Sequence, residues 1–134
     1  MIIVDTSVAF KWFSRKEDYR EQSLKILNRH LTGESFISVP DLFFYELSNA
    51  WTTKTLLPID QIHEYLNNLQ SFQLKTTPVS FNLLTNAADF SKKYHISVYD
   101  ACYAVFADEK GCDLITADAK FVRQVNLPFI KLLE

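Results

Sequence analysis

Short apolar runs alternate along the chain with longer stretches in which apolar positions recur every three or four residues. The short runs predict buried strands, which we place at Ile2–Val4, Phe36–Val39, Leu74–Val79, Leu114–Ala117 and Phe129–Leu133. The longer stretches predict helices, which we place at Tyr19–Leu31, Asp41–Thr55, Ile59–Phe72, Phe81–Tyr94 and Val98–Lys110. Alternating strands and helices favour an α/β fold with helices on both faces of a mostly parallel five-stranded sheet.

Turn-forming residues are scarce. The chain has only two glycines and four prolines, which argues against an all-β sandwich with its many tight turns. Pro78 stands within the third strand run, where it would remove a hydrogen bond from the ladder. The third strand is therefore expected at an edge of the sheet.

Length and charge narrow the class of protein. A chain of 134 residues fits one domain over residues 1–134 and is too short for two. Its net charge of -2 gives no overall basic field, so a nucleic-acid role must rest on site chemistry.

Asp5 interrupts the first apolar run, and the later run over 101–107 is far shorter than the roughly 18 residues of a membrane span. Cys102 and Cys112 have no metal-ligand spacing and are expected to be buried free thiols. These features predict a soluble cytoplasmic protein.

Three aspartates stand where helices begin. Asp5 and Asp118 each end a strand and precede a helical stretch, and Asp100 follows Ser97 at the spacing of a capping box. Helix capping is a sufficient explanation for any one of them. Glu46 is different, because its neighbours one helical turn away are largely apolar. A charge on that face requires a positive partner or a metal, unless its carboxylate reaches water at the rim.

A joint site explains all four acids together. In an open parallel sheet, ligands bind beyond the carboxyl ends of the strands, where the strand order reverses. The first and fourth strands are neighbours at that point in the common doubly wound order, so Asp5 and Asp118 are expected to face one crevice. The helices that begin at Asp41 and Ser97 would bring Glu46 and Asp100 to the same rim. Clustered carboxylates repel one another unless a cation neutralises them, and oxygen-only ligands favour Mg²⁺ or Mn²⁺. Such a cation suits phosphodiester hydrolysis.

Four segments occur in order along the chain: VDTSVAFKWF, YELSNAW, SVYDACYAVFA and LITADAKF. Together they resemble the PIN-domain nucleases, and most closely the VapC-type toxins of prokaryotic toxin-antitoxin pairs. The resemblance implies a three-layer α/β/α sandwich, one or two Mg²⁺ or Mn²⁺ ions, and cleavage of RNA. Its four acidic positions correspond to Asp5, Glu46, Asp100 and Asp118. Thr6 and Thr116 match polar positions that orient these acids, although a local cap or a β-forming residue explains each threonine equally well.

The resemblance also implies partners. VapC-type proteins are usually homodimers, and a small antitoxin blocks their site by laying a helix in a groove and sending an arginine toward the acids. Phe10, Trp12 and Phe13 are candidates for part of such a groove, with the hydrophobic core as the alternative. Near the site in sequence, four basic residues are candidate phosphate contacts or ordinary solvated charges: Lys11, Arg15, Lys16 and Lys120.

The implied reaction is in-line attack of a metal-activated water on phosphorus, with the 3' oxygen as leaving group. Asp5, Asp100 and Asp118 are the expected metal ligands, and Glu46 either binds metal or orients the water. A histidine-based ribonuclease fits less well, because His30, His63 and His95 occupy unrelated helical positions and are expected at the surface or at helix ends. An aspartyl-phosphate phosphatase would need an acid where Ser7 stands, and a receiver domain would need one where the third strand ends. Two further alternatives stay open: a PIN nuclease of RNA processing or decay without an antitoxin, and a non-catalytic PIN-fold binding module.

Overall fold

A computed structural model describes all residues, Met1–Glu134, as five strands and seven helices. The strands are β1 (Ile2–Val4), β2 (Ile37–Pro40), β3 (Lys75–Thr77), β4 (Leu114–Thr116) and β5 (Ile130–Leu132). The helices are α1 (Thr6–Phe13), α2 (Arg20–Leu31), α3 (Leu42–Thr53), α4 (Ile59–Ser71), α5 (Phe81–Tyr94), α6 (Val98–Lys110) and α7 (Ala119–Val125). The five strands and the five longer helices all lie where the apolar pattern predicted them.

All strands are parallel, in the order β3-β2-β1-β4-β5. From β1, the chain adds β2 and then β3 on one side of the sheet, and it later adds β4 and β5 on the other side. The strand order therefore reverses at the boundary between β1 and β4. This is the predicted neighbourhood of the first and fourth strands. β3 lies at an edge, also as predicted, and it ends at Thr77 because the following Pro78 cannot donate to a ladder.

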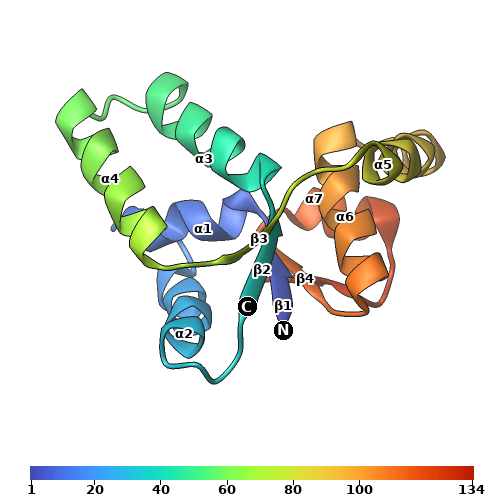
Figure 1. The fold of residues 1–134 in the computed structure, drawn as a ribbon, viewed down its shortest axis with the longest axis horizontal. Coiled ribbons are helices and arrows are strands. Elements are labelled where there is room, and N and C mark those ends of the chain that lie inside the picture. Colours follow the sequence, from blue (N-terminus) through green and yellow to red (C-terminus); the bar gives the residue numbers. More distant parts are fainter.

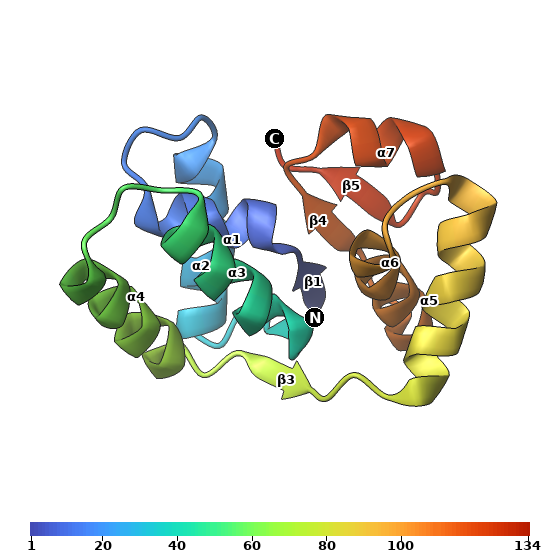
Figure 2. The ribbon, with the colours of Figure 1, turned by 90° about the horizontal axis from the view of Figure 1, so that it is seen from above.

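Helices cover both faces of the sheet, which gives the three-layer α/β/α arrangement (Figure 1). Seen along the carboxyl ends of the strands, α1 to α4 gather on one side and α5 to α7 on the other (Figure 2). α1 and α3 pack on one face of the central strands, and α6 packs on the opposite face. The first turns of α1, α3, α6 and α7 therefore come together above the carboxyl ends of β1 and β4.

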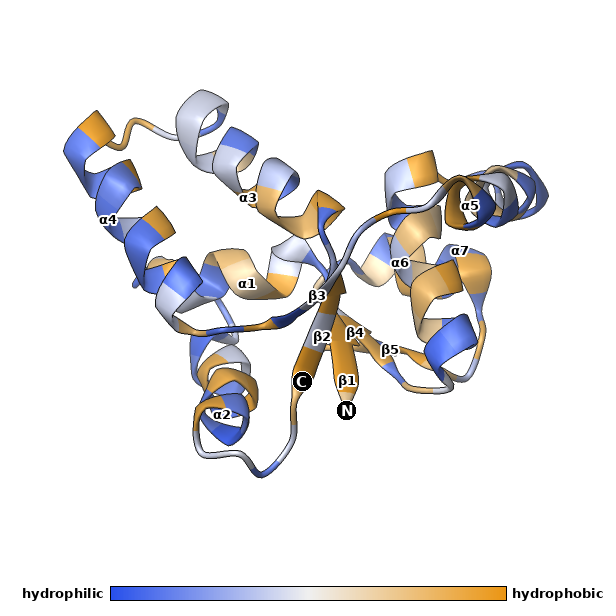
Figure 3. Cartoon of the chain, in the orientation of Figure 1, coloured by the Kyte–Doolittle hydropathy of each residue, from blue (hydrophilic) through white to orange (hydrophobic).

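The core lies between these layers. The central strands are apolar along most of their length, whereas α4 turns a polar face outward (Figure 3). Residues 101–107 of α6 are all buried, which explains why this helix has no polar stripe within that run. Trp12 is buried against Phe43, and its indole Nε1 donates to the backbone oxygen of Ser23 at 3.0 Å. Cys102 is buried and Cys112 half-buried, both as free thiols. No helix is both long and apolar enough to cross a membrane.

His30 lies at a helix end, one of the two places expected for the histidines, and it is buried there. His30, near the end of α2, is buried and accepts from the backbone N–H of Ile37 at 3.0 Å. Its Nε2 faces the carbonyl oxygen of Phe72 at 2.8 Å, so the proton must lie on Nε2 and the ring must be neutral. His63 and His95 are exposed. His30 thus joins α2, β2 and the end of α4 as a structural residue.

Candidate active site

The four predicted acids come from four separate elements near the carboxyl ends of β1 and β4. Asp5 follows β1 and caps α1, and Asp118 follows β4 and caps α7. Asp100 lies in the first turn of α6, and Glu46 lies in the second turn of α3. The charge of Asp100 raises the pKa of both Asp5 and Glu46, and Asp118 raises the pKa of Asp100. The four acids are therefore linked electrostatically, with Asp100 acting on Asp5 and Glu46 and Asp118 acting on Asp100.

Asp5 is the buried member of this group, with 5% of its surface exposed. Burial raises its pKa to about 6; hydrogen bonds from Ser7 and Thr116 oppose this increase, and the charge of Asp100 adds to it. Its Oδ1 accepts from the backbone N–H and the hydroxyl of Ser7. Its Oδ2 accepts from the hydroxyl of Thr116. Both carboxylate oxygens are held, so the orientation of Asp5 is fixed before any ligand arrives.

The hydroxyls that hold Asp5 also tie α1 to the end of β4. Ser7 Oγ accepts from the backbone N–H of Ala117 at 2.8 Å, and Thr116 Oγ1 accepts from that of Asp118 at 3.1 Å. Thr116 thus contacts an acid, whereas no hydrogen bond joins Thr6 to any of the four. Ser7 makes the contact with an acid that the resemblance had led us to expect from Thr6. Its signal in the sequence is its place two residues after Asp5, where a hydroxyl and a backbone N–H both reach an Asp side chain.

The hydrogen-bond partner of Glu46 is a neutral residue. The hydroxyl of Tyr103, on α6, donates to Glu46 Oε1 at 2.6 Å. Burial raises the pKa of Glu46, as does the charge of Asp100, while the Tyr103 hydrogen bond and the charge of Lys54 lower it. Glu46 itself is half-buried. A carboxylate in this position keeps its second oxygen for another ligand.

Asp118 and Asp100 take part in helix capping and also belong to the group of four acids. Asp118 accepts from the backbone N–H of Phe121 at 3.1 Å, as an N-cap does, and its side chain remains exposed. The backbone N–H of Asp100 donates to Ser97 Oγ at 3.0 Å, which completes one half of the predicted capping box. Burial is the main cause of the raised pKa of Asp100. The capping explanation is therefore correct locally and accounts for only part of the arrangement.

No basic side chain forms an ion pair with the group, although the charge of Lys54 acts on Glu46. The three ion pairs of the structure are Lys25–Glu21, Arg29–Glu34 and Lys131–Asp113, and none includes a site acid. The donors are all oxygens, which fits a hard divalent cation such as Mg²⁺ or Mn²⁺. No three of these carboxylates, or other Asp, Glu, His or Cys side chains, are drawn together into a ready-made metal site. The donor chemistry therefore fits a hard cation, and binding would require the carboxylates to converge on it.

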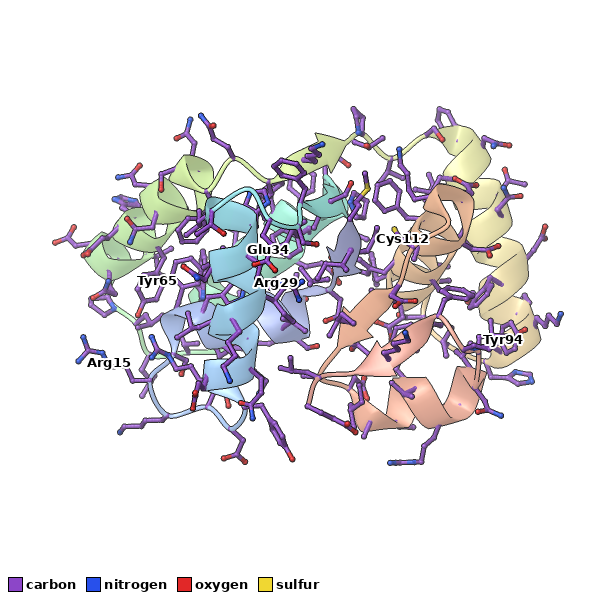
Figure 4. All side chains as sticks on the ribbon, turned by 90° about the horizontal axis from the view of Figure 1, so that it is seen from below. Arg15, Arg29, Glu34, Tyr65, Tyr94 and Cys112 are labelled. Carbon is purple, nitrogen blue, oxygen red and sulfur yellow. The ribbon has the colours of Figure 1, made fainter.

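A large cavity of the molecule has none of the four acids in its lining. It measures about 870 Å³ between the ends of α1, α3 and α4, and its lining includes Phe10, Trp12 and Phe13. Trp12 and Phe13 also pack in the hydrophobic core. Both expectations for the aromatic segment, the lining of a groove and the core, therefore apply to these two residues. Arg15 and Lys16 line the cavity as well, and Arg15 is exposed near Tyr65 at that end of the molecule (Figure 4).

The other two predicted basic residues lie elsewhere. Lys11 is half-buried in the last turn of α1, and Lys120 is exposed in the first turn of α7, two residues after Asp118. Of the four candidates, Lys120 is therefore the one nearest to a site acid along the chain.

Several solved structures share this fold at low sequence identity. VapC20 of Mycobacterium tuberculosis, described as a sarcin-ricin loop cleaving toxin, is 14% identical with a TM-score of 0.72, covering 97% of each chain. VapBC2 of Rickettsia felis, bound to a promoter DNA fragment, is 17% identical with a TM-score of 0.70, covering 98% of this chain and 97% of that chain. PAE2754 of Pyrobaculum aerophilum is 19% identical with a TM-score of 0.69, covering 97% and 87%. At these identities the likeness establishes the fold.

The sequence itself carries the family relationship. No curated protein sequence matches the chain. The profile of one family, described as PIN domain, matches residues 2–126 and so includes all four acids. With a match over nearly its whole length, the chain belongs to the PIN domain family.

Proposed function

We propose that this protein is an Mg²⁺- or Mn²⁺-dependent endoribonuclease, and the toxin of a toxin-antitoxin pair acting in the cytoplasm. The observation that carries the proposal is the group formed by Asp5, Glu46, Asp100 and Asp118, which has no basic partner. PIN domains are generally nucleases, so the family supports the hydrolase class. The choice of RNA and of a divalent metal rests on the chemistry of the acids and on the resemblance to VapC-type toxins.

In the proposed reaction, water attacks phosphorus in line and the 3' oxygen leaves. Asp5, Asp100 and Asp118 would hold the cation, and Glu46 would hold it or orient the attacking water with its free oxygen. A bound divalent cation supplies positive charge to the phosphate and makes water easier to deprotonate. Asp5 needs little reorganisation, because hydroxyl groups already hold both of its oxygens. Lys120, exposed beside Asp118, is placed to contact an RNA phosphate.

The proposed protein partners are a second copy of the chain and a small antitoxin. VapBC2 of Rickettsia felis and a Klebsiella pneumoniae relative, described as a toxin-antitoxin complex, support an antitoxin by their likeness to this chain. The cavity at the ends of α1, α3 and α4 offers an aromatic floor and a basic rim. It would suit a helix with one apolar face and acidic flanks. The homodimer rests on the resemblance alone.

The test is cleavage of RNA by the purified protein with Mg²⁺ or Mn²⁺, with EDTA, and with the variants Asp5→Asn and Asp100→Asn. We expect cleavage that EDTA abolishes and that each variant lowers by about 10²- to 10³-fold, the loss typical of removing one charge-stabilising group. Asp60→Asn, an exposed acid in the first turn of α4, is the matched control and should cleave normally. Cleavage in EDTA, or full activity in both site variants, would contradict the proposed mechanism.

A further inference from the structure

Tyr103 stands inside the acid group without being an acid. It lies one helical turn after Asp100, so the two side chains share a face of α6. Only 1% of Tyr103 is exposed, and its ring belongs to the main hydrophobic core beneath the acids. Its hydroxyl crosses from α6 to α3 and ends on Glu46 Oε1. The hydrogen bond therefore joins the two helices that carry Asp100 and Glu46.

The contact restricts Glu46 in a specific way. Glu46 accepts no other hydrogen bond from the protein and forms no ion pair. A glutamate side chain has several rotatable bonds, and ordering it costs conformational entropy. Tyr103 is anchored by its buried ring, so its hydroxyl is a rigid donor. One oxygen of Glu46 is thereby fixed, and the second has no hydrogen-bond partner in the protein, while the charge of Asp100 acts on the same carboxylate.

We propose that Tyr103 is a positioning residue that holds Glu46 Oε1 and so presents Oε2 as a ligand to the divalent cation. The inference rests on the proposed metal-dependent function of the same site. Groups that orient a metal ligand typically affect metal affinity by about 10- to 100-fold. Tyr103 contributes no ligand atom itself, so its effect must pass through Glu46.

The test compares Tyr103→Phe, Glu46→Gln and the double variant by Mn²⁺ titration followed by EPR, without RNA. Phenylalanine keeps the buried ring, so we expect a melting temperature close to that of wild type and Mn²⁺ binding weaker by about 10- to 100-fold. In the Glu46→Gln background the same change should alter Mn²⁺ affinity by less than about twofold, since coupled residues are not additive. Tyr94→Phe is the control, because this tyrosine is half-buried and its hydroxyl forms no hydrogen bond to protein. It lies at the end of the molecule opposite Arg15 (Figure 4).

Each alternative result has a distinct meaning. Unchanged Mn²⁺ affinity in Tyr103→Phe overturns the inference, and so does an equal loss in both backgrounds, which would indicate a general packing effect. Wild-type protein that binds no Mn²⁺ also overturns it. Wild-type protein that binds Mn²⁺ but cleaves no RNA would contradict the proposed function, while the Mn²⁺ titration would still support or overturn the role of Tyr103.

Discussion

Asp5 is an ionisable side chain that is almost completely removed from water and has no cation beside it. Folding raises its pKa from 3.8 to about 6, chiefly by burial. The folded state therefore binds this proton more tightly than the unfolded state does. Stability is highest below pH 4 for this group, and it falls as the pH rises through the folded pKa. The charged carboxylate is a destabilising feature that a bound cation would relieve.

The difference between the folded and unfolded pKa of Asp5 predicts that the free energy of unfolding depends measurably on pH. For EDTA-treated protein, Asp5 should lower the free energy of unfolding by about 2 kcal/mol between pH 4 and pH 7, since one pKa unit corresponds to about 1.4 kcal/mol and part of the shift lies below pH 4. Asp5→Asn should lack this contribution, so urea unfolding of the two proteins should diverge over that range, with the variant more stable at pH 7. Added Mn²⁺ should stabilise the wild type more than the variant. Parallel stability curves from pH 4 to pH 7 would contradict the assignment.

The sequence predicted the four acids and, through the resemblance, Thr116, which holds Asp5, but it predicted neither Ser7 nor Tyr103 as a partner. Strand ends and an apolar helix face are local signals, so Asp5, Asp118 and Glu46 could be recognised without a structure. The partners of Glu46 and Asp5 depend on contacts between residues far apart in the chain, such as Tyr103 with Glu46. The spacing of apolar residues along the chain does not indicate contacts of this kind. Tyr103 looks like an ordinary core residue of α6 until the fold places its hydroxyl.

At the scale of elements, α1 and β4 are joined through Asp5 by two hydroxyl side chains. Ser7→Ala would remove the donor to Asp5 and leave the backbone N–H of Ala117 without its partner. We expect the rate of RNA cleavage to fall by about 10- to 100-fold, as when other groups that orient a metal ligand are removed. Stability should fall by about 1–3 kcal/mol, measured by urea unfolding, because a buried N–H would lose its acceptor.

Thr6→Val is the comparison for Ser7→Ala. Valine keeps the shape of threonine and removes only the hydroxyl, which contacts none of the acids. If Thr6→Val lowers cleavage and Ser7→Ala does not, the supporting role belongs to Thr6, as the resemblance first implied. The opposite result would assign it to the serine of the VDTSV segment.

The two shortest helices show where pattern analysis of the elements ends. α1 and α7 each follow a capping aspartate, and that cap predicted a helical start at both places. Their lengths were not predicted, because eight residues of α1 include apolar side chains on several faces and seven residues of α7 span only two turns. Longer amphipathic helices such as α4 repeat their apolar stripe enough times to be delimited from sequence alone.

At the scale of the whole molecule, one rule about where strand order reverses predicted that the first and fourth strands are neighbours, and β1 and β4 do pair. The cavity between α1, α3 and α4 did not follow from any such rule, because it depends on how the α3–α4 pair stands away from the sheet. The predicted aromatic residues line it, together with residues of the α3–α4 connection that no motif marked. Leu56 in that connection is 103% exposed relative to a reference leucine, although it belongs to the cavity lining.

Full exposure of an apolar side chain at the mouth of a cavity predicts a contact with the proposed antitoxin. In Leu56→Asp, a charge would replace the apolar contact, and affinity for the antitoxin should fall by about 10- to 100-fold if the residue is a binding hot spot. The folded state should be unaffected, because Leu56 buries no surface within the chain. The measurement is growth of cells that co-express this protein with a small protein from a neighbouring gene, the proposed antitoxin.

Leu31→Asp is the matched control, since Leu31 is 53% exposed at the end of α2 and lies outside the cavity lining. We expect both variants to arrest growth when expressed alone, because neither residue is near the acids. The partner should rescue cells that carry Leu31→Asp and fail to rescue those that carry Leu56→Asp. Equal rescue would remove the cavity from the proposed antitoxin interface, and the absence of any neutralising neighbour would favour a PIN nuclease that works without an antitoxin.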